Sequence, residues 1–282
     1  MKTLQKALLV LSLLALIPIS MMAQSSKVVK EKRNLSGFSA ISISSGWDAV
    51  LTQGKNFSVT IEANQESMDN LRIELKNETL NVSSERGFRF SDIFRSRSNN
   101  IRKVHITLPE LQKITASGGS DILPQTQFRT ENMKVEMSGG SDLKGLSLHC
   151  QSLDCNMSGG SDASIHLVKG ENVKINSSGG SDVSLSGLSA TLLDLQTSGG
   201  SDVKLEGTTT NLQVNASGGS DVIAFQLKAI NCTVTLSGGS DANVYVTDAL
   251  NVSITGASDV RCKGNPHNVV KTIGRGSSLK MM

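Results

Sequence analysis

Aspartate recurs along this chain at a regular interval, and it is the residue type with the clearest chemical potential. It ends a Ser-Gly-Gly-Ser-Asp motif seven times and a Thr-Gly-Ala-Ser-Asp variant once, at intervals of 21, 20, 20, 20, 19, 20 and 18 residues. With an earlier copy in Ser45-Gly46-Trp47-Asp48, the aspartates are Asp48, Asp121, Asp142, Asp162, Asp182, Asp202, Asp221, Asp241 and Asp259. Aligned carboxylates could bind Ca²⁺, or two of them could serve as an acid and a base.

Apolar residues alternate on both sides of each motif, so the motif joins two strands. Met133, Val135 and Met137 precede Asp142 at nine, seven and five residues, and the same period of two resumes after each aspartate. A unit of about twenty residues is too short for a strand and a crossover helix, so equivalent strands must stack in parallel as coils. The sequence therefore predicts an all-β fold, a right-handed parallel β-helix or solenoid.

The motif itself has the composition of a tight corner between two strands. Adjacent glycines allow positive φ, and Ser and Asp side chains bond backbone N–H groups. Stacked corners place the aspartates in a column at about 4.8 Å spacing, where like charges repel. We expect hydrogen bonds from backbone N–H groups of the same turn and from serine hydroxyls of the next coil to offset this repulsion. A column of bound Ca²⁺ is the alternative, although each coil offers one carboxylate.

The chain divides into an export signal and one solenoid domain. Residues 1–23 have Lys2 and Lys6 before an apolar run, as in a secretory signal peptide, and no later segment could cross a membrane as a helix. We expect an N-terminal tail at 24–33, a domain at 34–276 and a tail at 277–282. Within the domain, we expect a β-meander cap at 34–116, the repeat array at 117–262 and a C-terminal end at 263–276. Strands are expected in the cap at 57–62, 71–75 and 79–82.

A basic and aromatic loop at 85–103 interrupts the cap. It is either a long hairpin loop whose rings pack on the scaffold or an interaction arm for an anionic envelope glycan, a lipid headgroup or a partner protein. Nucleic acid is not an expected partner of an exported chain. The candidate arm residues are Arg86, Phe88, Arg89, Phe90, Phe94, Arg95 and Arg97.

Composition argues against most catalytic and metal-dependent functions. Without Lys2 and Lys6 the formal charge falls from +3 to near +1, which selects no polyanionic partner. The four histidines, His105, His149, His166 and His267, show no mutual spacing, and no cofactor site is predicted. Cys150, Cys155, Cys232 and Cys262 lack zinc-ligand spacing, so they are core residues, or Cys150 and Cys155 form a disulfide.

The recurrent corners, the Ser45-Gly46-Trp47-Asp48 copy and the strand Val104-His105-Ile106-Thr107-Leu108-Pro109-Glu110-Leu111 resemble the putative auto-transporter adhesin head GIN domain family, which is common in Bacteroidetes. The resemblance extends from about Asn34 to about Gly276. It implies an extracytoplasmic β-solenoid and supplies no catalytic residues.

These observations favour an exported, non-catalytic protein of the cell envelope, with a binding, adhesin-like or structural role. The periplasm, the outer membrane and the cell exterior are all compatible with the sequence, and the oligomeric state is left open. A calcium-stiffened extracellular rod is one alternative. A polysaccharide-active enzyme is the other, because parallel β-helices can host such chemistry on one face.

Overall fold

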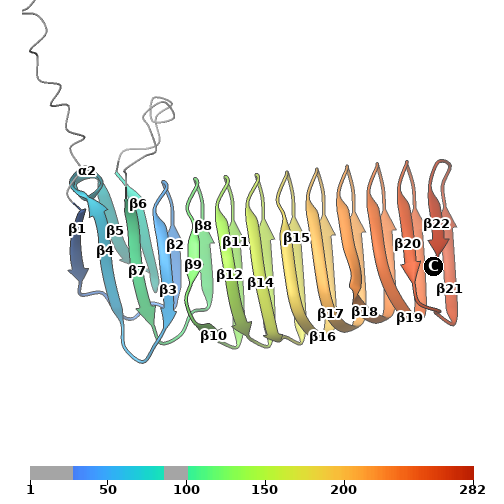
Figure 1. Ribbon diagram of the computed structural model, residues 1–282, viewed down its shortest axis with the longest axis horizontal. Coiled ribbons are helices and arrows are strands. Elements are labelled where there is room, and N and C mark those ends of the chain that lie inside the picture. Colours follow the sequence, from blue (N-terminus) through green and yellow to red (C-terminus); the bar gives the residue numbers. More distant parts are fainter. Residues whose placement is uncertain (1–27, 86–100) are drawn as a thin grey trace, which may run out of the picture.

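The protein is a rod of stacked β-coils (Figure 1). The structure is a computed structural model and describes residues 28–85 and 101–282. It is a β-solenoid of about eight turns with coils of about twenty residues, as the repeat predicted. The strands lie across the long axis of the rod, with tight corners along one edge and wider bends along the other (Figure 1).

Each coil of the array contributes one strand before its corner and one after it. The strands before the corners form one parallel layer and those after the corners form a second, with side chains of both layers meeting between them. In the first half of the array the strands are separate: β8 (Lys113–Ala116), β9 (Ile122–Pro124), β10 (Gln127–Arg129), β11 (Asn132–Met137), β12 (Asp142–His149), β13 (Ser152–Met157), β14 (Asp162–Lys169) and β15 (Asn172–Ser177).

In the second half the strand after one corner continues through the bend into the strand before the next corner. These long strands are β16 (Val183–Thr197), β17 (Asp202–Ala216), β18 (Asp221–Leu236) and β19 (Asp241–Ile254). They are followed by β20 (Asp259–Lys263), β21 (Asn268–Ile273) and β22 (Ser278–Met281). Because β22 pairs in parallel with β20, the solenoid continues into a segment for which the sequence predicted a tail.

The N-terminal end is covered by antiparallel pairs, and the three cap strands expected from the sequence are present. These strands are β4 (Ser58–Asn64), β5 (Leu71–Lys76) and β6 (Thr79–Ser84). β5 and β6 form a hairpin whose turn residues Asn77 and Glu78 have positive φ. β4 pairs with β7 (Arg102–Leu108) and with β1 (Val28–Arg33), a strand inside the segment expected to be a tail. A short helix, α2 (Gln65–Asp69), follows β4, and no helix within the described ranges is long and apolar enough to cross a membrane.

The first coil in the sequence is not the first coil of the rod. β2 (Ala40–Ile43) lies between β6 and β8, and β3 (Asp48–Gln53) lies between β7 and β9, all in parallel. The chain therefore makes the β2–β3 coil, moves outward to build the cap and the β6–β7 coil, and then returns to continue with β8.

Inward-facing aliphatic columns form the core, at the positions that the period of two predicted. Seven residues before the corner aspartates, consecutive coils place buried side chains in register: Val135, Cys155, Ile175, Leu195, Val214, Val234 and Val252. Burial of each Val, Leu or Ile side chain stabilises the fold by about 1.5–3 kcal/mol. The core therefore consists of columns of stacked apolar side chains, and each coil adds one side chain to each column.

The first glycine of a corner packs closely against the backbone of the preceding coil. At Gly199 φ is +82°, and a Cβ built there would lie 2.7 Å from the carbonyl oxygen of Gly179 in the preceding coil. The second glycine, Gly200, has no positive φ, and its Cβ would lie 3.8 Å from the same oxygen. The variant corner carries Ala257 at this second position, which agrees with the difference in space.

Replacement of the first glycine should therefore be costly, whereas replacement of the second should be tolerated. We expect Gly199→Ala to lower the free energy of unfolding by at least about 2 kcal/mol, since it combines a left-handed backbone with a clash against backbone atoms. Gly200→Ala is the matched control and should change it by less than about 0.5 kcal/mol. Urea unfolding followed by circular dichroism measures both, and equal losses would contradict this account of the corner.

Candidate functional site

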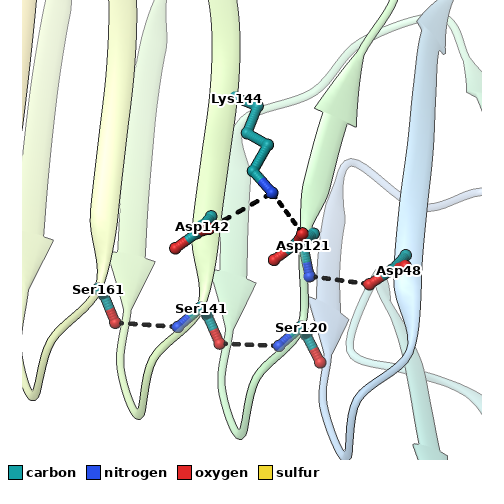
Figure 2. Close-up of polar contacts among 7 residues, drawn as sticks. All are labelled: Asp48, Ser120, Asp121, Ser141, Asp142, Lys144 and Ser161. Atoms are coloured by element: carbon teal, nitrogen blue, oxygen red, sulfur yellow. Dashed lines mark hydrogen bonds and ion pairs between the residues drawn. The ribbon is translucent and has the colours of Figure 1, made fainter. Parts of the chain in front are cut away.

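The corner aspartates stack in a column, as the repeat predicted. Asp142 and Asp162 are register partners, as are Asp202, Asp221, Asp241 and Asp259 in succession. Asp48 belongs to the same column, because its coil lies directly beside that of Asp121 (Figure 2). Neighbouring strands in a sheet are about 4.8 Å apart. Each carboxylate inside the column is therefore close to two others, whereas Asp48 and Asp259 at its ends have Lys103 and Ser278 on their outer sides.

Backbone hydrogen bonds between coils stabilise these carboxylates. At several corners the N–H of an aspartate donates to Oδ1 of the aspartate in the preceding coil, at 3.2 Å from Asp121 to Asp48 and 3.3 Å from Asp202 to Asp182. The N–H groups of Asp162 and Asp221 donate instead to a serine carbonyl of the preceding coil. The sequence predicted donors from the same turn and from serine hydroxyls of the next coil. The N–H donors instead belong to the next coil, and a serine hydroxyl acts at the last corner, where Ser278 Oγ is 2.6 Å from Asp259 Oδ1.

One lysine bridges the column near its start. Lys144 Nζ lies 2.5 Å from Asp121 Oδ2 and 3.4 Å from Asp142 Oδ2 (Figure 2). The hydrogen bond to Asp121 is the main reason that the pKa of Lys144 lies above its usual value. Because the lysine side chain is half exposed, these ion pairs contribute little to stability.

The serine before each aspartate forms a second, buried column. Ser120, Ser141, Ser161 and their equivalents have no exposed surface. The N–H of Ser141 donates to Ser161 Oγ at 3.3 Å, and Ser201 Oγ donates to the carbonyl of Ser198 in its own corner at 3.1 Å. The N–H groups of the serine column point to the following coil, whereas those of the aspartate column point to the preceding one (Figure 2).

Two carboxyl groups in the column have raised pKa values. Partial burial is the largest cause for Asp221, and the charges of Asp202 and Asp241 add to it, against the hydrogen bond from the Asp241 N–H. Partial burial also comes first for Asp48, followed by the opposing effect of the Asp121 N–H. Ionisation of these two carboxyl groups is therefore less favourable in the folded protein than in the unfolded chain.

The hydrogen bonds of the corners use carboxylate oxygens that a metal ion would also need. Within residues 28–85 and 101–282, no group of three or more His, Cys, Asp or Glu side chains is placed to hold a metal ion. Each coil offers one carboxylate, one of whose oxygens accepts a backbone N–H at several corners, whereas Ca²⁺ takes six to eight oxygen ligands.

All four cysteines lie among the described residues as buried free thiols, so Cys150 and Cys155 do not form the disulfide considered from the sequence. Burial raises the pKa of Cys150 to about 11 and that of Cys155 to about 12. A thiol in this state is a poor nucleophile and metal ligand. The cysteines therefore fill the core.

The proposed arm residues, Arg86 to Arg97, lie outside the described residues, but the two ends of that insertion are well anchored. The insertion joins β6 to β7 at the edge where the other coils have their corners. Trp47 stands where a corner serine would be; it is fully buried, and its Nε1 donates to Ser84 Oγ at 3.1 Å. On the other side, Arg102 donates to Ser67 Oγ at 3.2 Å and to the Ser45 carbonyl at 3.3 Å.

A polar furrow of about 770 Å³ runs along the layer of strands that precede the corners, and the sequence analysis did not identify it. Its two walls are outward-facing rows, six and four residues before the aspartates, and both could have been found by counting back from each motif. The first row is Thr115, Glu136, Asn156, Asn176, Gln196, Asn215 and Thr235, and the second is Ser138, Ser158, Ser178, Ser198, Ser217 and Ser237.

A second depression, of about 620 Å³, lies on the other layer, beside the aspartates. It includes Asp142, Asp162, Asp182 and Asp202 together with Lys144 and Lys204. The positive charges of the two lysines therefore partly compensate the negative charges of the aspartates in this depression.

Residues 37–166 and 161–266 match the sequence profile of a family described as putative auto-transporter adhesin, head GIN domain. No functionally curated protein matches the chain. Three solved structures share its fold, each over 91% of this chain. A putative lipid binding protein from Parabacteroides distasonis is 18% identical, with a TM-score of 0.62 and 97% of its chain covered. A putative adhesin from the same organism is 17% identical, with a TM-score of 0.63 and 98% of its chain covered. A putative adhesin from Parabacteroides merdae is 16% identical, with a TM-score of 0.59 and 96% of its chain covered.

The raised pKa of Asp221 predicts a pH-dependent gain in stability when its charge is removed. Because the folded-state pKa lies above the unfolded value, ionisation destabilises the fold as the pH rises through that range. Asp221→Asn should raise the unfolding midpoint at pH 7 by about 1–2 °C and give no gain near pH 3, where both forms are neutral. Thermal melts from pH 3 to 8 test this, and a gain that persists at pH 3 would rule out the charge as its cause.

The hydrogen-bonded corners predict a stability that does not depend on calcium. We expect the unfolding midpoint of the chain from Gln24 to shift by less than about 1 °C between EDTA and millimolar Ca²⁺, since a ligand that binds only the folded state would raise it. Mg²⁺ at the same concentration controls for ionic strength. A large rise specific to Ca²⁺ would instead make the aspartate column a metal site.

Proposed function

We propose that this chain, which belongs to the putative auto-transporter adhesin head GIN domain family, is a non-catalytic binding rod of the bacterial cell envelope. In this proposal residues 1–23 direct export, and the single solenoid domain expected at 34–276 extends at its ends to include β1 and β22. The mature chain is located in the periplasm, on the outer membrane or outside the cell. The observation that carries the proposal is the uniformity of the rod, since the same corner and the same outward rows recur in coil after coil.

Uniform rows argue for an extended contact surface rather than an active site. Catalysis by two carboxylates needs groups whose environments push their pKa values apart. Here the aspartates occupy the same position in each corner, and the two with raised pKa values, Asp48 and Asp221, lie several coils apart. Three histidines have separate structural partners: His105 bonds Glu62, His166 bonds Ser186, and His267 pairs with Asp248. No described coil therefore gathers a distinct set of polar residues for chemistry.

The Arg/Phe insertion supplies a second contact in this proposal. Both of its ends are held by the cap, through Ser84 and Arg102. Its sequence alternates basic and aromatic residues, a combination suited to an anionic glycan, a lipid headgroup or an acidic protein surface. The rod would thus combine a charged contact near one end with neutral rows along its length.

Binding to envelope material tests this function. We expect the mature chain to co-sediment with outer-membrane fractions of a Bacteroidetes bacterium. Replacement of Arg86, Arg89, Arg95 and Arg97 by serine should weaken binding on the order of tenfold at low salt, because the charge attraction is lost.

A variant with Lys32, Lys169, Lys174 and Lys228 replaced by serine removes the same charge elsewhere and should lose less than about twofold. Equal losses in the two variants would argue against the arm as a contact. Failure of the wild-type chain to bind any envelope fraction would leave only a structural role for the rod.

A further inference from the structure

We infer that the polar furrow binds an uncharged linear glycan laid along the axis of the rod. This inference rests on the proposed envelope-binding function and names one of its ligands. The furrow spans the coils from Thr115 to Thr235, six coil intervals or about 29 Å. Each coil contributes two outward side chains, one on each wall, with an inward residue between them.

The hydrogen bonds of the furrow divide it into an occupied half and an available half. Near its start, Glu136 is paired with Lys113 at 2.8 Å and with Lys134 at 2.7 Å. Next, Asn176 Nδ2 donates to Asn156 Oδ1 at 2.8 Å, and Asn156 Nδ2 donates to Asp154 at 2.9 Å. Much of the polar capacity of this half is therefore used within the protein.

The following three coils present side chains that are not used in this way. Among the hydrogen bonds of the described residues, none involves the side chains of Gln196, Asn215 or Thr235, which are all exposed. The hydroxyl groups of Ser198, Ser217 and Ser237 on the opposite wall also take part in none of these hydrogen bonds; Ser237 is exposed, and Ser198 and Ser217 are partly exposed. Six donor and acceptor groups thus face solvent in three successive pairs, about 4.8 Å apart along the rod.

The charge and spacing of these pairs favour a neutral glycan over other polymers. The ionisable side chain in the furrow lining is Glu136, outside the available half, so an anionic chain meets no cation there. An extended peptide along the axis advances about 3.3 Å per residue and would drift out of register with the coils. A pyranose unit of an extended glycan has a length close to the coil spacing, and its hydroxyl groups suit amide and hydroxyl partners.

The lining also lacks an aromatic ring on which a sugar could stack. Each glycan chain should therefore bind weakly, and many chains on a surface would bind a rod through their combined contacts.

Titration with oligosaccharides of defined length tests the inference. The probes are cellobiose and the neutral hexasaccharides cellohexaose, mannohexaose and xylohexaose, with hexagalacturonate as the anionic comparison, followed by NMR or calorimetry on the mature chain. We expect at least one neutral hexasaccharide to bind, cellobiose to bind more weakly than cellohexaose if cellohexaose is the ligand, and hexagalacturonate to bind more weakly than the neutral ligand.

Paired variants on the same two strands locate the site. Asn215→Ala with Thr235→Ala removes two furrow groups and should weaken binding about fivefold or more. Gln213→Ala with Thr233→Ala changes outward residues of the same coils, two positions farther from the corner and outside the furrow, and should change it less than about twofold. Both variants should retain the wild-type unfolding midpoint, because all four side chains face outward.

The inference is overturned if no neutral hexasaccharide binds at millimolar concentration, if hexagalacturonate binds as well as the neutral chains, or if both paired variants lose binding equally. Envelope co-sedimentation separates this outcome from failure of the proposed function. A wild-type chain that binds envelope fractions but none of the neutral probes keeps the proposed function and loses the furrow as its glycan site.

Discussion

The spacing between coils is the constraint on which the rest of this structure depends. Every strand must lie about 4.8 Å from its neighbours for the parallel ladders to form, and the corners must close to the same spacing. This is why Gly199 meets the Gly179 carbonyl so closely that a Cβ has no room. The same spacing stacks the aspartates and the buried serines, so the structure must satisfy a repeated set of polar groups at these closely packed corners.

The two polar columns solve this problem together. At a corner the backbone turns away from regular pairing, which leaves N–H groups without strand partners. Serine hydroxyls accept some of them from the preceding coil, and aspartate carboxylates accept others from the following coil. The charge of the column is tolerated because most of its carboxylates accept a hydrogen bond or an ion pair and all of them keep access to water. Lys144 is a local addition at the start of the array rather than a repeated element.

The repeat made the fold predictable, because a period of two and a constant corner identify both layers and the inward columns. The donors to the aspartates were not predictable, because they depend on how far one coil is offset from the next. β1 was missed because its inward positions include Glu31 and Arg33 and show no apolar alternation. β22 was missed because Ser278 replaces the aspartate that marks a corner, and the furrow was missed because its serines belong to the motif and were assigned to the turn.

The placement of the β2–β3 coil between two later coils has a consequence for the order of folding. In the array, neighbouring rungs are about twenty residues apart, but Asp48 finds its partner Asp121 73 residues along the chain. The loop that must close is longer, so its entropic cost is greater and its formation is slower. As the chain is made from its N-terminus, the β2–β3 coil therefore cannot pair on both sides until the residues up to Pro124 are available. The later coils can then add one by one to an existing template, so growth runs toward the C-terminus.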